Sequence, residues 1–220
     1  MSTALASGAA MRRTGPRDGL PVVCVNGGTG QVKPGDWSAS LEWIVQALAP
    51  RFPALAFHEV RYRVKSWRRL DMCIEDAHAA LDQARDQDGR RTLVIGFSMG
   101  GAVAIGAAGH PSVAAVVGLA PWIPPALDIR TLAGKRMAVI HGSLDGGLPG
   151  IPGVSPRSSR AGLERIAAEG IETSYSLIRG AVHPIAVRWR GGRPLPLPRA
   201  GTWARLVAGE LERFQTEEGA

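Results

Sequence analysis

The sequence predicts an α/β protein built on a mostly parallel, open sheet of about six strands, with helices on both faces. Three observations carry this prediction. Apolar segments of strand length alternate with segments of helix length, the pattern of parallel strands joined by right-handed crossovers. Between Thr92 and Leu127 the chain contains no Asp, Glu, Lys or Arg, as expected for strands covered on both faces. A length of 220 residues suits one domain with a sizeable core.

The strands are predicted from short apolar runs. The uncharged run is long enough for a membrane-spanning helix, but its glycines and His110-Pro111 would interrupt such a helix. It divides instead into a strand, a helix of small residues that can pack close to a sheet, and a second strand. The six strands are expected at about 20–25, 54–60, 92–97, 113–119, 136–141 and 173–178.

The helices are predicted between these strands. Asp71 is placed to cap one of them, and Glu75 and Asp76 then lie in its first turns, where the helix dipole favours negative charge. The helices are expected at about 38–49, 71–87, 99–108, 159–169 and 202–216.

The domain prediction is a single unit over 20–216. Residues 1–19 lack the compact apolar stretch of a secretory signal and are expected to be a disordered leader, too short to add strands, and 217–220 a tail. Only Pro121 to Lys135 separates two neighbouring strands, so no cap domain is expected. The protein is expected to be cytoplasmic and not bound to a membrane.

The composition argues against a nucleic-acid partner. The net charge is +7 and the pI about 10.4, but arginine supplies almost all of the excess, as in a chain from a high-GC genome such as an actinobacterium's. No helix-turn-helix, zinc or RNA-binding motif is present. Cys24 and Cys73 are far apart in sequence and indicate neither a disulfide framework nor a metal site.

Gly96-Phe97-Ser98-Met99-Gly100 is the motif most informative about function. An apolar strand leads into it and a helix leaves it at once, so the turn is sharp and holds the Ser98 hydroxyl exposed at the strand end. A serine hydroxyl in this position is a candidate nucleophile, which needs an adjacent base to take its proton.

A candidate acid and a candidate base follow in the chain. Asp145 comes after the strand at 136–141 and His183 after the strand at 173–178, where parallel α/β sheets place their ligands. Asp128 is the alternative acid, although it lies further from its strand end. Surface or core roles are expected for His58, His78 and His110. His141 closes the strand before Asp145 and is expected to be structural or to support the site residues.

The order Ser98, Asp145, His183 resembles the α/β-hydrolase fold. The resemblance extends over about 20–216, and Leu20 to Val25 is similar to the first preserved strand. Asn26 stands in the next loop where these enzymes often carry a histidine. The resemblance implies a Ser98–His183–Asp145 triad, an oxyanion hole made by the backbone N–H groups of Met99 and Gly28, and neither metal nor cofactor. The short chain is most similar to compact, lidless members such as dienelactone-hydrolase-like enzymes and small esterases.

The substrate side chains are predicted from residues that follow strands. Arg61, Arg63 and Lys65 come directly after the strand at 54–60 and are candidates to bind an anionic group of the substrate. Trp37 and Trp122 are candidate walls of an apolar pocket, with core packing as the competing role. The irregular loops 146–156 and 188–199 receive no assignment beyond a place near the site.

The function expected from these features is cleavage of a small carboxylic ester or thioester through an acyl-enzyme. Two alternatives stay open. One is a non-catalytic small-molecule binder that kept the fold, and the other is an acyltransferase or cyclase that uses the same triad.

Overall fold

The computed structural model describes residues 2–84, 91–146 and 153–219. One mixed sheet has the strand order β1-β2-β4-β3-β5-β6-β7-β8. Its strands are β1 (Ser2–Ala4), β2 (Ala10–Thr14), β3 (Leu20–Val25), β4 (Leu55–Arg61), β5 (Thr92–Phe97), β6 (Val113–Leu119), β7 (Arg136–Gly142) and β8 (Glu172–Ile178). A separate hairpin pairs β9 (Ala186–Arg188) with β10 (Pro194–Pro196).

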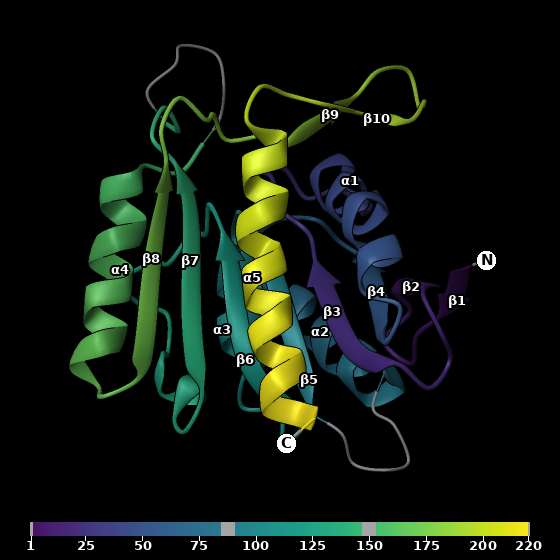
Figure 1. Ribbon diagram of the computed structural model, residues 1–220, viewed down its shortest axis with the longest axis horizontal. Coiled ribbons are helices and arrows are strands. Elements are labelled where there is room, and N and C mark those ends of the chain that lie inside the picture. The colour runs from purple at the N-terminus through teal and green to yellow at the C-terminus, as the bar shows by residue number, and fades with distance from the viewer. Residues whose placement is uncertain (1, 85–90, 147–152, 220) are drawn as a thin grey trace.

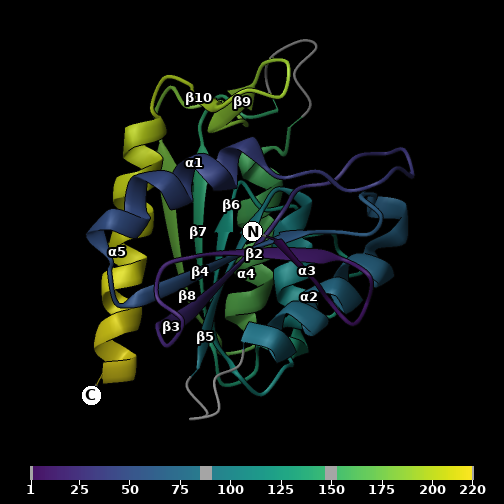
Figure 2. The ribbon, with the colours of Figure 1, turned by 90° about the vertical axis from the view of Figure 1, so that its right-hand side faces the viewer.

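Over the described ranges, five α-helices cover the two faces of this sheet. They are α1 (Ala39–Leu48), α2 (Leu70–Ala84), α3 (Met99–Ala107), α4 (Pro156–Ala168) and α5 (Ala200–Gly219). Helices α1 and α5 lie on one face and α2, α3 and α4 on the other (Figures 1 and 2). Short 3-10 helices occur at Ala49–Arg51, Trp67–Arg69 and Arg130–Leu132. The predicted α/β class with helices on both faces is therefore confirmed.

The strands from β3 to β8 pair in parallel, so their carboxyl ends meet at one edge of the sheet. Every residue of β5, β6 and β7 is buried, which explains the long run without charge. The β9–β10 hairpin lies over this edge (Figure 1). The residues from 120 to 135 join β6 to β7 with one short 3-10 helix, and no cap domain is inserted in the described chain.

The prediction of a disordered leader disagrees with the structure, in which β1 and β2 bring the main sheet to eight strands. Strand β2 runs antiparallel to β4, and β1 antiparallel to β2. Both strands are short and mostly exposed, so they lack the apolar run that identifies a buried strand. Leu5, Ala9 and Met11 are nevertheless buried and join the core beside α2.

Some helix boundaries also differ from the sequence prediction. Helix α2 begins at Leu70, so Asp71 lies in its first turn instead of capping it. Its predicted end at residue 87 lies outside the described residues. Helix α4 begins at Pro156 with Ser155 as its cap, and α5 continues to Gly219 where a tail is expected. No described helix is both long and apolar enough to cross a membrane.

A buried histidine in β4 predicts acid sensitivity of the fold. Burial, followed by the charge of Arg13, lowers the pKa of His58 from 6.5 to about 4, and its Nδ1 atom has no hydrogen-bond partner in the part of the chain that the structure describes. Because only the unfolded chain takes up this proton, stability falls as the pH drops from 6.5 towards 4. We expect His58 to account for about 2 kcal/mol of the stability lost between pH 7.5 and pH 5.

Urea unfolding of the wild type and His58→Gln at these two pH values tests this expectation. Between pH 7.5 and pH 5, the free energy of unfolding should fall by about 2 kcal/mol less in His58→Gln than in wild type. An equal loss in both proteins would show that His58 is not the responsible group.

Candidate active site

The sharp turn after β5 holds Ser98 in a backbone conformation that most residues avoid. Ser98 has φ 56° and ψ −119°. Its N–H donates to the carbonyl of Leu119 at 2.9 Å, and its own carbonyl accepts from the N–H groups of Gly101 and Trp122, both at 2.9 Å. These three bonds fix the turn between β5, α3 and the end of β6. The hydroxyl therefore projects at the carboxyl edge of the sheet.

Both glycines of the motif are required by close backbone approach. A Cβ added to Gly96 would overlap the carbonyl oxygen of Gly100, and one added to Gly100 would overlap that of Val25. Backbone atoms in a packed sheet cannot move aside cheaply. We expect Gly100→Ala to destabilise the fold by about 3 kcal/mol or more.

Chemical denaturation of Gly100→Ala beside Gly109→Ala measures this effect. An added Cβ at Gly109 meets only Thr131, at ordinary contact distance of 3.8 Å. Gly109→Ala should therefore change stability little, and equal stability of the two variants would refute the packing argument.

The structure brings Ser98, His183 and Asp145 into one hydrogen-bonded chain. The distance from Ser98 Oγ to His183 Nε2 is 2.9 Å, and from His183 Nδ1 to Asp145 Oδ2 it is 2.7 Å. Asp145 has a fully buried side chain, and that of His183 is 11% exposed. The ring of Phe97 packs against His183 with 5.0 Å between centroids.

Two loops place the acid and the histidine. The turn after β7 carries Asp145, and its residues Ser143 and Leu144 donate through their N–H groups to the carbonyls of Ile178 and Ala181, both at 2.9 Å. The segment after His183 is bound to the start of α1, where Ser40 Oγ accepts from the N–H groups of Ile185 at 3.1 Å and Ala186 at 3.3 Å.

Asp145 is an ionised acceptor with every oxygen occupied. Burial alone would raise its pKa, but hydrogen bonds from His141 and His183 outweigh burial, so the pKa of Asp145 lies below its ordinary value. Its Oδ1 accepts from the N–H of Val154 at 2.9 Å, and its Oδ2 also accepts from His141 Nε2 at 2.9 Å. Because a carboxylate only accepts, His183 carries its proton on Nδ1 and its Nε2 is left to accept from Ser98.

The structure places His141, for which the sequence predicts a structural or supporting role before Asp145, in direct contact with that acid. Its imidazole is fully buried, and Ser159 of α4 lies with Oγ 2.7 Å from its Nδ1. Loop 146–156 also contributes, since Val154 binds Asp145 and the backbone of Gly153 packs against the same carboxylate. Residues 147–152 of that loop lie outside the described residues.

The alternative acid Asp128 lies elsewhere. It is exposed and bound to Arg130 through two hydrogen bonds of 2.9 Å. Hydrogen bonds from Arg130 lower the pKa of Asp128 to about 2. No hydrogen bond or ion pair joins its carboxylate to a described histidine.

The loop after β3 lies against the candidate nucleophile. A Cβ added to Gly27 would lie 3.2 Å from Ser98 Cβ, and one added to Gly28 would overlap the side chain of Met99. In the described chain, the N–H groups of Gly28 and Met99 donate to no protein acceptor. Both are therefore available to a ligand beside Ser98.

Asn26 braces this loop at the position where a histidine is usual in the resembling enzymes. Its Oδ1 accepts from the N–H of Gly27 at 2.7 Å, and its Nδ2 donates to the carbonyl of Asp36 at 3.1 Å. Its own carbonyl accepts from the hydroxyl of buried Tyr62 at 3.0 Å. The departure from the usual histidine thus leaves the loop fixed.

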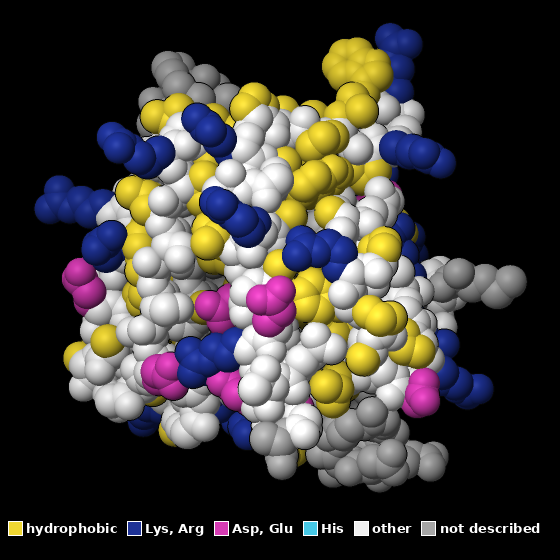
Figure 3. Space-filling view, in the orientation of Figure 1, with side chains coloured by type: hydrophobic (Ala, Val, Ile, Leu, Met, Phe, Trp, Pro, Cys, Tyr) yellow, Lys and Arg dark blue, Asp and Glu magenta, His cyan; other side chains and the backbone are white. Residues whose placement is uncertain are grey.

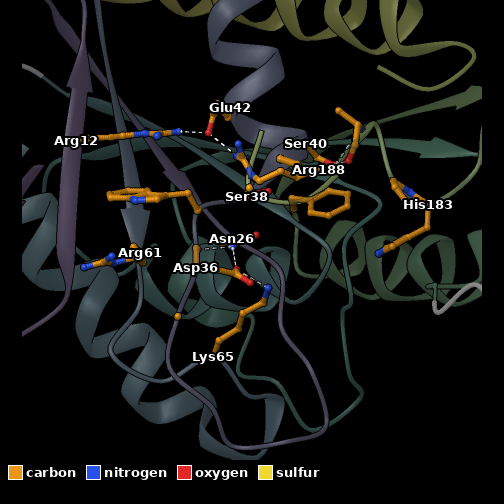
Figure 4. Close-up of a pocket in the computed structure, with 17 residues that line it drawn as sticks. Arg12, Asn26, Asp36, Ser38, Ser40, Glu42, Arg61, Lys65, His183 and Arg188 are labelled. Carbon is orange, nitrogen blue, oxygen red and sulfur yellow. Dashed lines mark hydrogen bonds and ion pairs between the residues drawn. The ribbon is translucent and has the colours of Figure 1, made fainter. Parts of the chain in front are cut away.

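Two cavities meet at this site. The small cavity, of about 380 Å³, contains Ser98, Gly28 and Met99 and is walled by Trp67, Trp122 and Val154. The large cavity, of about 780 Å³, contains Trp37, Arg12, Arg61 and Arg188 (Figure 4). Four residues line both cavities: Asn26, Lys65, Phe97 and His183.

Four of the five predicted substrate residues line these cavities, and Arg63 does not. Arg61 and Trp37 line the large cavity, Trp122 the small one and Lys65 both. Arg63 is instead held by Asp76, a fully buried acid of α2, at 2.7 Å, and also contacts Glu75. Strand direction alone does not reveal this, because the acids lie on α2, the next α-helix along the chain, 12 and 13 residues after Arg63.

Trp67 and Arg188 also line the cavities but were not predicted as substrate residues. Trp67 lies in the basic segment after β4, and Arg188 in the loop at 188–199 that received no assignment. Over the described residues, no group of three or more His, Cys, Asp or Glu side chains is arranged to hold a metal ion.

Comparison with known proteins identifies the fold and the family. Among solved structures, a sugar hydrolase (YeeB) from Lactococcus lactis has a TM-score of 0.71 at 14% identity, over 99% of this chain and 98% of that one. Est1E from Butyrivibrio proteoclasticus has a TM-score of 0.68 at 13% identity, over 98% and 99%. The propionate-bound esterase Est2 from Thermogutta terrifontis has a TM-score of 0.65 at 15% identity, over 99% and 93%.

Identities this low establish a shared fold only, and no curated protein matches the chain in sequence. The family model described as serine aminopeptidase S33 matches residues 61–183, the segment that contains Ser98, Asp145 and His183. Since this segment is more than half of the chain, the protein belongs to the serine aminopeptidase S33 family of α/β-hydrolases.

Proposed function

We propose that the protein is a serine hydrolase that cleaves a carboxylic ester or thioester of a small molecule through an acyl-enzyme. The observation that carries the proposal is the unbroken chain of hydrogen bonds from Ser98 Oγ through the His183 ring to Asp145. An exposed serine with no such base would be a poor nucleophile.

In this proposal His183 is the general base and then the general acid. Its Nε2 takes the proton of Ser98 as Oγ attacks the substrate carbonyl carbon, and returns that proton to the leaving oxygen or sulfur. Water then attacks the acyl-enzyme by the same route, which releases the acid and restores Ser98. Asp145 holds the Nδ1 tautomer and stabilises the imidazolium, and His141 positions Asp145.

The oxyanion is assigned to the backbone N–H groups of Gly28 and Met99. Both groups lie beside Ser98, and that of Met99 is at the amino end of α3, where the helix dipole favours negative charge. The apolar walls of the small cavity, Trp67 and Trp122, suit the acyl group.

The charges at the site favour an ester over the amino end of a peptide. An aminopeptidase must bind a substrate ammonium group next to the scissile bond. The two acids that line the large cavity are both already bound to cations, Asp36 to Lys65 and Glu42 to Arg12 and Arg188. No unpaired carboxylate is therefore offered to an ammonium group by the described lining.

Product analysis tests the reaction class. The protein is incubated with short-chain and aromatic 4-nitrophenyl esters, with and without an acceptor amine or alcohol. We expect the free acid as the main product in both conditions. Acylated acceptor as the main product would establish the acyltransferase alternative, and a folded protein that binds esters without turnover would establish the binder.

A further inference from the structure

We propose that the large cavity receives the leaving group of the substrate, and that this group carries a carboxylate or a phosphate bound by Arg61 and Lys65. The inference rests on the proposed ester cleavage and adds the substrate class. It is carried by the position of the large cavity, by its charge and by the unpaired state of Arg61.

The position of the large cavity relates it to the leaving group. Its lining includes His183 and the following residues Pro184 and Ala186, but not Ser98, Gly28 or Met99. The substrate carbonyl must lie between Ser98 and the two N–H donors, in the small cavity. The group that receives a proton from His183 Nε2 leaves on the far side of that carbonyl, where the large cavity opens.

The lining of the large cavity carries a positive excess. Among the described residues, four basic side chains line it, Arg12, Arg61, Lys65 and Arg188, with two acidic ones, Asp36 and Glu42 (Figure 4). Burial alone would raise the pKa of Glu42, but hydrogen bonds from Arg188 and Arg12 outweigh it, so its pKa is lowered and the carboxylate is ionised and neutralised. On the face in Figure 3, most of the visible acidic side chains lie in the middle and lower part, while Lys and Arg side chains gather in the upper half.

Arg61 differs from the other three cations of the large cavity because an aromatic ring, and no described carboxylate, positions it. It has no acidic partner within the described residues, and its guanidinium lies 5.4 Å from the centre of the Trp37 ring. The same ring lies 4.5 Å from Arg12, which is itself held by Glu59 and Glu42 at 2.7–2.9 Å. Stacking on a fixed ring orients a guanidinium while leaving its N–H donors free for a planar or tetrahedral anion.

Lys65 joins the two cavities. Its side chain is only 17% exposed, and its Nζ lies 2.6 Å from Oδ1 of Asp36, which is itself half exposed. One Asp36 oxygen occupies one of its three donors, so the other two are left for an anion. Lys65 is therefore a second cation for the leaving group, on the lining that both cavities share with His183.

The test compares esters that differ only in the place of a charge. The butyrate ester of 3-hydroxybenzamide is neutral, and those of 3-hydroxybenzoate and 3-hydroxyphenyl phosphate carry an anion on the leaving group. The hemisuccinate ester of 3-hydroxybenzamide carries the anion on the acyl side. Each is measured at low ionic strength with wild type, Arg61→Gln and the control Arg17→Gln, which removes an exposed arginine at the opposite edge of the sheet.

For each ester with an anionic leaving group, kcat/KM is divided by that of the neutral ester. For the better of the two anionic esters, we expect this ratio to be about tenfold to a hundredfold lower in Arg61→Gln than in wild type. In Arg17→Gln the ratio should stay within about twofold of wild type. The ester whose ratio falls more, the carboxylate or the phosphate, identifies the anion that the site prefers. An unchanged ratio in Arg61→Gln, or an effect confined to the hemisuccinate, would overturn the proposal.

A binding measurement separates this proposal from the catalytic one. Calorimetry with 3-hydroxybenzoate or 3-hydroxyphenyl phosphate on Ser98→Ala should detect binding that weakens about tenfold or more when Arg61→Gln is added. Such binding without ester turnover by wild type would reject the proposed hydrolysis and keep the anion site. Ester turnover without such binding would reject the anion site alone.

Discussion

Replacing Ser98 with alanine should lower kcat for ester hydrolysis by about 10⁴- to 10⁶-fold, the largest effect expected of any single change. The variant removes the Oγ atom that lies 2.9 Å from His183 Nε2 and leaves the other members of the hydrogen-bonded chain in place. What activity remains would come from binding and from the donors of Gly28 and Met99 acting on attack by water.

The control for this change is stability, because an inactive variant could simply be unfolded. Ser98 lies in a turn fixed by backbone hydrogen bonds. The Ser98→Ala variant should therefore fold, with a free energy of unfolding within about 0.5 kcal/mol of that of wild type. Ser158→Ala, on the exposed surface of α4, should retain wild-type kcat. A folded Ser98→Ala protein with more than about a tenth of wild-type kcat would contradict the assigned nucleophile.

Replacing Asp145 with asparagine should lower kcat by about 10³- to 10⁴-fold through the wrong tautomer of His183. The carboxylate accepts at both oxygens, at Oδ1 from Val154 and at Oδ2 from His141 and His183. An amide has one oxygen only. If that oxygen faces Val154, the NH2 group faces His183 and requires an unprotonated Nδ1, which puts the proton on Nε2 where it can no longer accept from Ser98.

Asp128→Asn is the matched control, because Asp128 is the other acid compatible with the sequence. Its carboxylate binds Arg130 at the surface, so kcat should stay within about twofold of wild type. Losses of similar size in the two variants would contradict the assignment of Asp145.

The nucleophile turn and the strands around it could be predicted from the sequence because local chemistry determines them. Thr92–Phe97 and Val113–Leu119 have the predicted bounds. Such strands are buried on both faces and so are apolar throughout, and the glycines beside Ser98 are demanded by contacts within the turn itself or with the adjacent strand. The proximity of Asp145 and His183 follows from parallel strands ending at one edge.

The features that were not predicted depend on contacts between separate elements of the fold. Strands β1 and β2 have no apolar period of their own and are held by pairing with β4. The hydrogen bond between His141 and Ser159 of α4 was not predicted, and Arg188 is held at the large cavity by Glu42 of α1, 146 residues away in sequence. Arg63 comes two residues after Arg61, the last residue of β4, but its side chain turns to Asp76, a buried acid of α2. A single sequence carries no periodic pattern for such pairs.

Labelling with a fluorophosphonate tests the central assignment most directly, since phosphorus bonds to an activated serine Oγ and fluoride leaves. The wild-type protein is treated with the probe and the adduct is located by mass spectrometry, with Ser98→Ala in parallel. We expect one adduct per chain, on Ser98, absent from the variant. A folded wild-type protein that stays unlabelled, or that is labelled equally with and without Ser98, would contradict it.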